Sequence, residues 1–184
     1  FLMAWWIVFA VATDLVERVR PASVAASKLW ARLKLVPRTM WGMWLAHLGV
    51  AAFAFGVSMV NTYGIERDVK MEMNDTVEVA GYVFTYRGVR DYQGPNYQAV
   101  QGLVEVTRNG KPVATMRPEK RIYRVQQNPM TEAAIDTGFT RDLYVSLGEP
   151  VGANNAWVVR VYFKPFIDWI WGGCVLMALG GVLA

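Results

Sequence analysis

A single histidine lies within an apolar run that is long enough to cross a lipid bilayer. The run extends from Met40 to Val60 without another ionisable residue, and His47 is the only histidine of the chain. Because about 20 apolar residues span a bilayer, we expect residues 40–60 to form a transmembrane helix. An ionisable side chain at membrane depth is costly, so His47 is a candidate functional residue. Its neutral imidazole could ligate a redox cofactor through one nitrogen, or it could hydrogen-bond a neighbouring helix.

Two further apolar segments indicate a fragment of a polytopic α-helical membrane protein. Residues 166–184 are long enough to span when tilted, and they carry Trp169 and Trp171 where an interfacial aromatic belt would lie. Residues 1–12 are too short to span alone and lack the basic start of a signal peptide. We therefore interpret residues 1–12 as the end of a transmembrane helix that begins upstream. A hydrophobic content of 54% fits this class.

The distribution of charge predicts the orientation of these helices. Residues 13–39 form a short basic loop of the kind retained in the cytoplasm, whereas residues 61–165 are nearly balanced in charge and are expected in the periplasm of a bacterium. The basic residues of the loop are Arg18, Arg20, Lys28, Arg32, Lys34 and Arg38. The net charge of +4 is thus mainly a topology signal, with some contact to membrane lipid as the alternative. No basic stripe with interleaved aromatic residues suggests nucleic acid.

Residues 61–165 carry the patterns of short β-strands. Alternating or short apolar runs occur at residues 69–73, 76–80, 82–87, 103–108, 113–117, 122–125 and 157–163. Asn109-Gly110 is a hairpin signal, because both central residues of a type I′ turn need positive φ. We expect a small antiparallel barrel or sandwich, with one helical turn around Glu132 to Ile135. The only cysteine, Cys174, lies outside this domain, so no disulfide supports it.

The face of the predicted helix around His47 carries small side chains. Ala51, Ala54 and Ser58 follow at helical spacing, which would leave clearance for a flat macrocycle. The other side also carries small residues, namely Gly42, Ala46, Gly49, Ala52 and Gly56. That pattern suits close helix packing, so the small residues near His47 could equally reflect crowding. Met40 and Met43 are better explained by packing than by coordination.

An ordered set of segments makes the chain recognisable. They are Trp41-Gly42-Met43, Ala46-His47, Gly49, Glu66-Arg67-Asp68-Val69, Gly94-Pro95-Asn96-Tyr97, Met130 to Asp136, Arg141-Asp142-Leu143-Tyr144, and Tyr162 to Phe166 followed by Trp169-Ile170-Trp171. Over nearly its whole length the chain resembles the C-terminal part of the CcmF family, the membrane haem lyases of bacterial System I cytochrome c maturation.

The resemblance implies a haem lyase of the bacterial inner membrane. Such proteins take haem from the chaperone CcmE and join its vinyl groups to the thiols of a Cys-x-x-Cys-His motif in apocytochrome c, which CcmH and CcmI present. They also hold a transmembrane haem b, with quinol as the electron donor. The family's histidine ligand before the large periplasmic domain matches His47, which makes His47 the expected axial ligand of the haem iron. The second axial ligand is expected outside this chain.

The chain also departs from the family pattern. The tryptophan-rich WWD segment and the two periplasmic histidines are missing, and Trp5-Trp6 does not match that segment. We therefore expect the fragment alone to be inactive, and no catalytic residue can be named. The alternative function is a membrane-anchored periplasmic docking or assembly module without its own redox cofactor.

Two features of the predicted periplasmic domain have alternative interpretations. Arg67, just after the membrane helix, could pair with a haem propionate or form a salt bridge with Glu66 or Asp68. Residues 130–136 and 141–144 could face a partner protein, or they could form a buried polar network that closes the domain.

Overall fold

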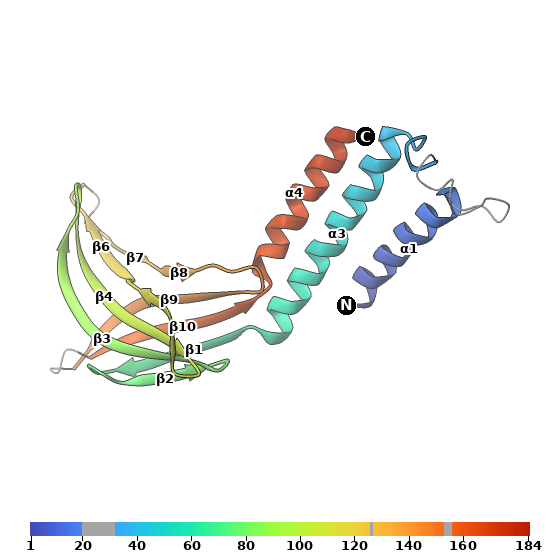
Figure 1. Cartoon of the computed structure of the whole chain (residues 1–184). Coiled ribbons are helices and arrows are strands. Elements are labelled where there is room, and N and C mark those ends of the chain that lie inside the picture. The colour runs from blue at the N-terminus through green and yellow to red at the C-terminus, as the bar shows by residue number, and fades with distance from the viewer. Residues whose placement is uncertain (20–31, 126, 153–155) are drawn as a thin grey trace. The chain divides into compact units, whose positions relative to one another are not determined.

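The chain folds into two compact units. The structure, a computed structural model, describes residues 1–19, 32–125, 127–152 and 156–184 (Figure 1). One unit is helical and comprises Phe1–Thr62 with Phe166–Ala184, and the other comprises Tyr63–Pro165. Residues 20–31, the middle of the predicted basic loop, lie outside the described residues.

The helical unit contains three described helices. They are α1 (Leu2–Val19), α3 (Arg38–Tyr63) and α4 (Ile167–Leu183). In the part of the chain that the structure describes, α3 is the helix long and apolar enough to cross a membrane, and α4 is a shorter apolar helix. Helix α1 continues past residue 12, and an ion pair between Asp14 and Arg18, four residues apart, supports its last turns.

Glycines bring the backbones of α3 and α4 into direct contact. Gly42, Gly49 and Gly56 recur every seven residues along α3, and all three are buried. A Cβ atom on Gly49 would lie 2.7 Å from the carbonyl oxygen of Gly173, and one on Gly180 would lie 2.5 Å from the amide nitrogen of Ala46. The two helices run antiparallel, side by side (Figure 1). The prediction that these small residues serve close helix packing is confirmed.

The second unit is a β-sandwich of two antiparallel sheets. The strand order is β1-β10-β9-β8 in one sheet and β2-β3-β4-β6-β7 in the other, where β5 also pairs with β4. The first sheet consists of β1 (Ile65–Met71), β8 (Ala134–Asp136), β9 (Arg141–Val151) and β10 (Ala156–Pro165). The second consists of β2 (Thr76–Val79), β3 (Tyr82–Gln93), β4 (Tyr97–Arg108), β5 (Lys111–Met116), β6 (Glu119–Tyr123) and β7 (Pro129–Glu132).

The core of the sandwich comes from alternate residues of both sheets. Tyr82, Phe84 and Tyr86 of β3 face Val159 and Val161 of β10, and all five are buried. The remaining buried core residues are Met71, Val79, Val104, Val106, Met116, Leu143, Val145, Leu147 and Trp157. In each strand, one residue in two faces inward, and these residues of the two sheets form one core. The expectation of a small antiparallel barrel or sandwich is therefore confirmed, and the fold is a sandwich.

Local conformation agrees with the sequence at one turn and differs in another segment. Asn109 and Gly110 have φ of 51° and 72°, and Arg108 pairs with Lys111, so the predicted two-residue hairpin is confirmed. The predicted helical turn around Glu132 to Ile135 is wrong. Glu132 ends β7 and Ala134 begins β8, and pairing of these strands with β6 and β9 satisfies the backbone and overrides local helix propensity.

Candidate functional site

His47 lies exposed on α3 with one ring nitrogen already engaged. Its Nδ1 atom is 2.8 Å from the carbonyl oxygen of Met43, one helical turn earlier. A carbonyl oxygen only accepts hydrogen bonds, so Nδ1 must carry the hydrogen and donate it. The neutral ring then has its lone pair on Nε2. Ligating histidines in proteins commonly show this arrangement, with the second nitrogen bound to a carbonyl.

An apolar groove between α1 and α3 adjoins this imidazole. The groove has a volume of about 280 Å³. Its lining residues are Trp6, Ile7, Ala10, Val11, Asp14, Met43, Trp44 and His47. Aromatic and aliphatic side chains dominate this lining, which suits a flat apolar ligand better than a hydrated one.

One polar contact across the two helices borders the groove. The indole Nε1 of Trp44 donates to Oδ2 of Asp14 over 2.7 Å, and Nε of Arg18 lies 3.0 Å from both carboxylate oxygens. This contact ties α1 to α3 one turn before His47. Sequence reasoning did not identify Asp14 or Trp44 as part of a site. The sequence feature that could have identified this contact is the carboxylate of Asp14 near the end of an apolar helix.

The other residues predicted to face a macrocycle do not all line the groove of His47. Ala51 is 4% exposed and lines a second apolar groove together with Ala4 and Trp5 of α1. Ala54 and Ser58 are half-buried, and the Ser58 hydroxyl donates to the Ala54 carbonyl over 2.8 Å. His47 and Ala51 therefore line different apolar grooves beside α1, although they are one helical turn apart.

Arg67 is exposed on β1 and is not paired with its sequence neighbours. The register places Arg67 opposite Val161, whereas Asp68 lies opposite Arg160 and forms an ion pair with it at 3.2 Å. Successive residues of a strand point to opposite faces, which separates Arg67 from Glu66 and Asp68. The salt bridge proposed from the sequence is therefore wrong, and the propionate contact stays a prediction.

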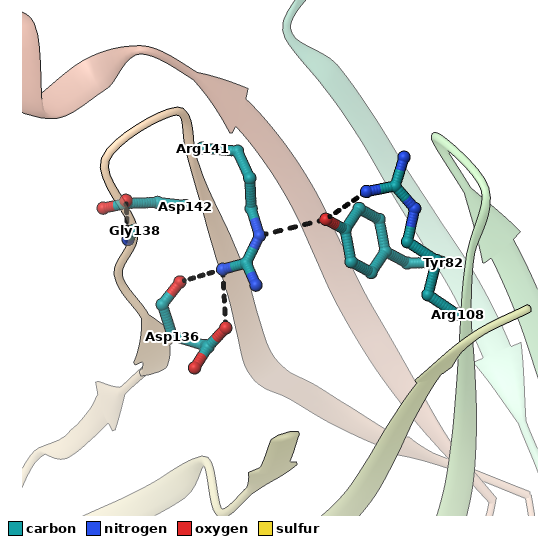
Figure 2. Close-up of polar contacts among 6 residues, drawn as sticks. All are labelled: Tyr82, Arg108, Asp136, Gly138, Arg141 and Asp142. Carbon is teal, nitrogen blue, oxygen red and sulfur yellow. Dashed lines mark hydrogen bonds and ion pairs between the residues drawn. The ribbon is translucent and has the colours of Figure 1, made fainter. Parts of the chain in front are cut away.

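A polar network joins the two sheets of the β-sandwich. Nη1 of Arg141 donates to the carboxylate of Asp136 over 2.5 Å and to its carbonyl over 2.9 Å, while Nε donates to the Tyr82 hydroxyl over 3.2 Å. Nη1 of Arg108 donates to the same hydroxyl over 3.1 Å. Figure 2 shows Arg141 between Asp136 and Tyr82, with Arg108 on the far side of the tyrosine.

This network joins the two segments left open by the sequence, because Asp136 belongs to residues 130–136 and Arg141 to residues 141–144. Burial opposes the charge of Arg141, but hydrogen bonds with Tyr82 and Asp136 outweigh it and raise the pKa of the guanidinium. Arg141 thus remains a cation and connects β8 and β9 to β3. For residue 141 the interpretation as a network that closes the domain is confirmed.

The residues present fit one half of a haem-ligand set. Among the residues that the structure describes, no group of three or more His, Cys, Asp or Glu side chains could hold a metal ion. His47 offers one nitrogen beside an apolar groove, which fits a single axial ligand of a haem iron. A second protein ligand would have to come from elsewhere in a longer protein.

The fold is defined by a β-sandwich whose sequence lies between those of two apolar, glycine-packed helices. A family described as the CcmF C-terminal beta-sandwich matches residues 62–165. The chain belongs to the CcmF family.

Relatives match the helices as well as the sandwich. The chain is 48% identical over 184 residues to the cytochrome c-type biogenesis protein CcmF of Pseudomonas aeruginosa, covering 100% of this chain and 27% of that protein. It is 49% identical over 143 residues to the CcmF of Escherichia coli, covering 78% of this chain and 22% of that protein. The chain thus spans about a quarter of the length of these relatives.

A solved structure has the same arrangement of elements. The structure named Cytochrome c Heme Lyase CcmF aligns with a TM-score of 0.70 and 18% identity, covering 97% of this chain and 33% of that one. At this identity the likeness supports the fold alone.

Proposed function

We propose that this chain is the part of a membrane haem lyase that supplies one axial ligand to a transmembrane haem b. The observation that carries the proposal is the His47 imidazole, whose Nδ1 is held by the Met43 carbonyl and whose Nε2 is available beside an apolar groove. Relatives named for cytochrome c biogenesis and a structure named for haem lyase activity support it.

Each residue of the site has a definite task in this proposal. The Met43 carbonyl fixes the tautomer and orientation of the ring. His47 would hold the haem iron through its Nε2. The contact between Asp14 and Trp44 holds the wall of the groove. When bound, the haem supplies one-electron transfer, with quinol as the donor.

The full-length protein would attach haem to apocytochrome c. By family resemblance it receives haem from CcmE and meets the apocytochrome with CcmH and CcmI. The 184 residues lack the segments that handle the substrate haem in the family, so we propose that they are inactive by themselves. Their contribution is electron input and support of the complex.

The proposal includes a topology in the bacterial inner membrane. Residues 1–12, 40–60 and 166–184 would lie in the membrane, residues 13–39 in the cytoplasm and residues 61–165 in the periplasm. The length and apolarity of α3 support this topology, as does the excess of basic residues before it.

A reduced-minus-oxidised optical spectrum with a pyridine haemochrome assay tests the ligand. The full-length protein is compared with its His47→Ala variant and with Ser58→Ala as the control, because Ser58 does not line the groove of His47 and its hydroxyl donates to Ala54 of its own helix. We expect His47→Ala to lose the b-type signal at normal yield and Ser58→Ala to keep it. An unchanged signal in His47→Ala would leave His47 as a helix-packing residue and favour the docking module.

A further inference from the structure

The outer face of the six-stranded sheet carries a cluster of arginine and tyrosine side chains. The register places Arg90 opposite Gln101 and Tyr92 opposite Ala99, and it continues this face onto β6 with Glu119, Arg121 and Tyr123. Gly102, between these positions, faces Leu147 in the core, which shows that Gln101 and Leu103 point outward. We call this surface the Arg–Tyr face. Its residues are Arg87, Arg90, Tyr92, Tyr97, Gln101, Leu103, Arg117, Glu119, Arg121 and Tyr123.

A pocket in the Arg–Tyr face is lined by three arginines and no acid. Its volume is about 220 Å³, and Arg87, Arg90 and Arg117 line it together with Gln101, Leu103 and Val89. Arg87 is offset by Glu105, since its Nε lies 2.9 Å from that carboxylate. Arg90 bonds to a neutral amide, and Arg117 makes no hydrogen bond or ion pair within the described residues. In this part of the chain, two guanidinium charges therefore remain without a carboxylate partner.

The guanidinium of Arg90 is preorganised by a buried chain of hydrogen bonds. Its Nε and Nη2 both donate to Oε1 of Gln101, over 3.0 and 2.6 Å. Gln101 in turn donates to Glu119, and Arg121 donates to the other oxygen of that carboxylate. Gln101 and Glu119 are 8% and 7% exposed, so this support is fixed within the sheet surface. One edge of the Arg90 fork is thereby used, and its Nη1 edge remains for a ligand.

A tyrosine cluster extends the same face beyond the arginines. The rings of Tyr97 and Tyr123 are 5.5 Å apart, Tyr92 lies 6.4 Å from Tyr97, and the Arg121 guanidinium lies 4.5 Å above the Tyr97 ring. Tyrosine and arginine are enriched at protein interfaces, where rigid rings supply contact area and guanidinium groups bind carboxylates. This composition favours a protein partner over a free small anion.

We propose that the pocket of Arg87, Arg90 and Arg117 binds a carboxylate side chain from an acidic segment of a partner protein, with the adjoining tyrosines packing against the same segment. The occupant follows from charge complementarity, because a carboxylate matches the fork of Arg90 and the unpaired charge of Arg117. The surface lies wholly within the β-sandwich and makes no use of His47. It therefore goes beyond the proposed haem site.

Fluorescence anisotropy of a labelled peptide of alternating glutamate and serine tests the proposal on the full-length protein in detergent. We expect saturable binding that weakens with added salt. Loss of a charge-assisted hydrogen bond should weaken binding about tenfold in Arg117→Gln and in Arg90→Gln. Arg117→Gln removes no hydrogen bond or ion pair within the described residues, so it also guards against a folding defect. Arg160→Gln, an exposed arginine of the other sheet, serves as the matched control and should bind as the wild type.

Three results would overturn the proposal. The first is that the Arg90→Gln, Arg117→Gln double variant binds the peptide as tightly as the wild type. The second is that a glutamine–serine peptide binds as tightly as the glutamate–serine peptide. The third is that inorganic phosphate or anionic vesicles displace the peptide at matched charge. The last result would make the pocket a general anion site. The His47→Ala variant should bind the peptide normally, so failure of this test and failure of the haem assay are separate outcomes.

Discussion

At the scale of single residues, Tyr86 carries a hydroxyl that the core does not satisfy. The side chain is 0% exposed, and its Oη makes no hydrogen bond within the described residues. Tyr82, four residues earlier on the same strand, has a hydroxyl that accepts from both Arg108 and Arg141. The two tyrosines of one strand therefore have opposite energetic roles.

We expect Tyr86→Phe to stabilise the sandwich by about 1 kcal/mol, because it removes a buried polar group without a partner. Tyr82→Phe should destabilise it by about 1 kcal/mol, because two guanidinium donors lose their acceptor. Urea denaturation followed by tryptophan fluorescence measures both changes. If the two variants shifted the unfolding midpoint in the same direction, this assignment of roles would fail.

The pH dependence of stability in Tyr86→Phe gives a second measurement. Burial raises the pKa of Tyr86 from 10.0 to about 12, so the folded state favours the neutral phenol. This contribution to stability is fully present below pH 10 and is lost as the pH rises through about 12. As the pH rises through this alkaline range, the urea unfolding midpoint of Tyr86→Phe should therefore fall less than that of the wild type. Parallel curves would contradict a buried phenol.

At the scale of elements, the contact between α3 and α4 depends on glycines rather than on large side chains. A Cβ atom on Gly173 would lie 2.6 Å from the Gly49 carbonyl oxygen and 2.6 Å from the Phe53 amide nitrogen. A Cβ atom on the adjacent Gly172 would meet nothing within 4 Å. The chain thus offers two neighbouring glycines with opposite surroundings.

We expect Gly173→Val to force the helices apart and to cost about 3 kcal/mol or more, since a rigid backbone cannot yield as a side chain can. Gly172→Val should have little effect, because its side chain would point into open space. It is a suitable control, because both variants change helix propensity in the same way. Thermal unfolding of the full-length protein in detergent compares them. Equal losses in the two variants would show that propensity, not the helix contact, determines the result.

Some elements could be predicted from the sequence because their signals are local. Asn109-Gly110 and the alternation of Tyr82, Phe84 and Tyr86 specify a turn and an inner face by themselves. The hairpin at Ala80-Gly81 has similar positive φ values of 52° and 76°, but alanine gives no such signal. The strands of residues 129–136 depend on pairing with distant strands, which local patterns do not reveal.

At the scale of the whole molecule, the contacts that join separate elements could not be predicted. Arg141 and Tyr82 are 59 residues apart, and Trp44 and Asp14 are 30 apart. Neither pair belongs to a sequence motif, because each depends on how the sheets or helices pack. His47 was identifiable since a lone ionisable residue in an apolar run is itself a signal. The bond from its Nδ1 to Met43 became visible only with the side-chain geometry.

The division into two units leads to a last prediction about autonomous folding. Every residue of the buried core cluster lies between Met71 and Val161, and Ile65 pairs with Phe163, so both ends of the sandwich leave it at neighbouring positions. We expect residues 63–165 expressed alone to unfold cooperatively with a stability of about 5 kcal/mol or more. Residues 72–165 should fail to do so, because they lack β1 and with it Met71, which is 1% exposed in the core. Circular dichroism during urea unfolding compares the two segments. A broad, non-cooperative transition of residues 63–165 would show that the sandwich needs the helical unit to fold.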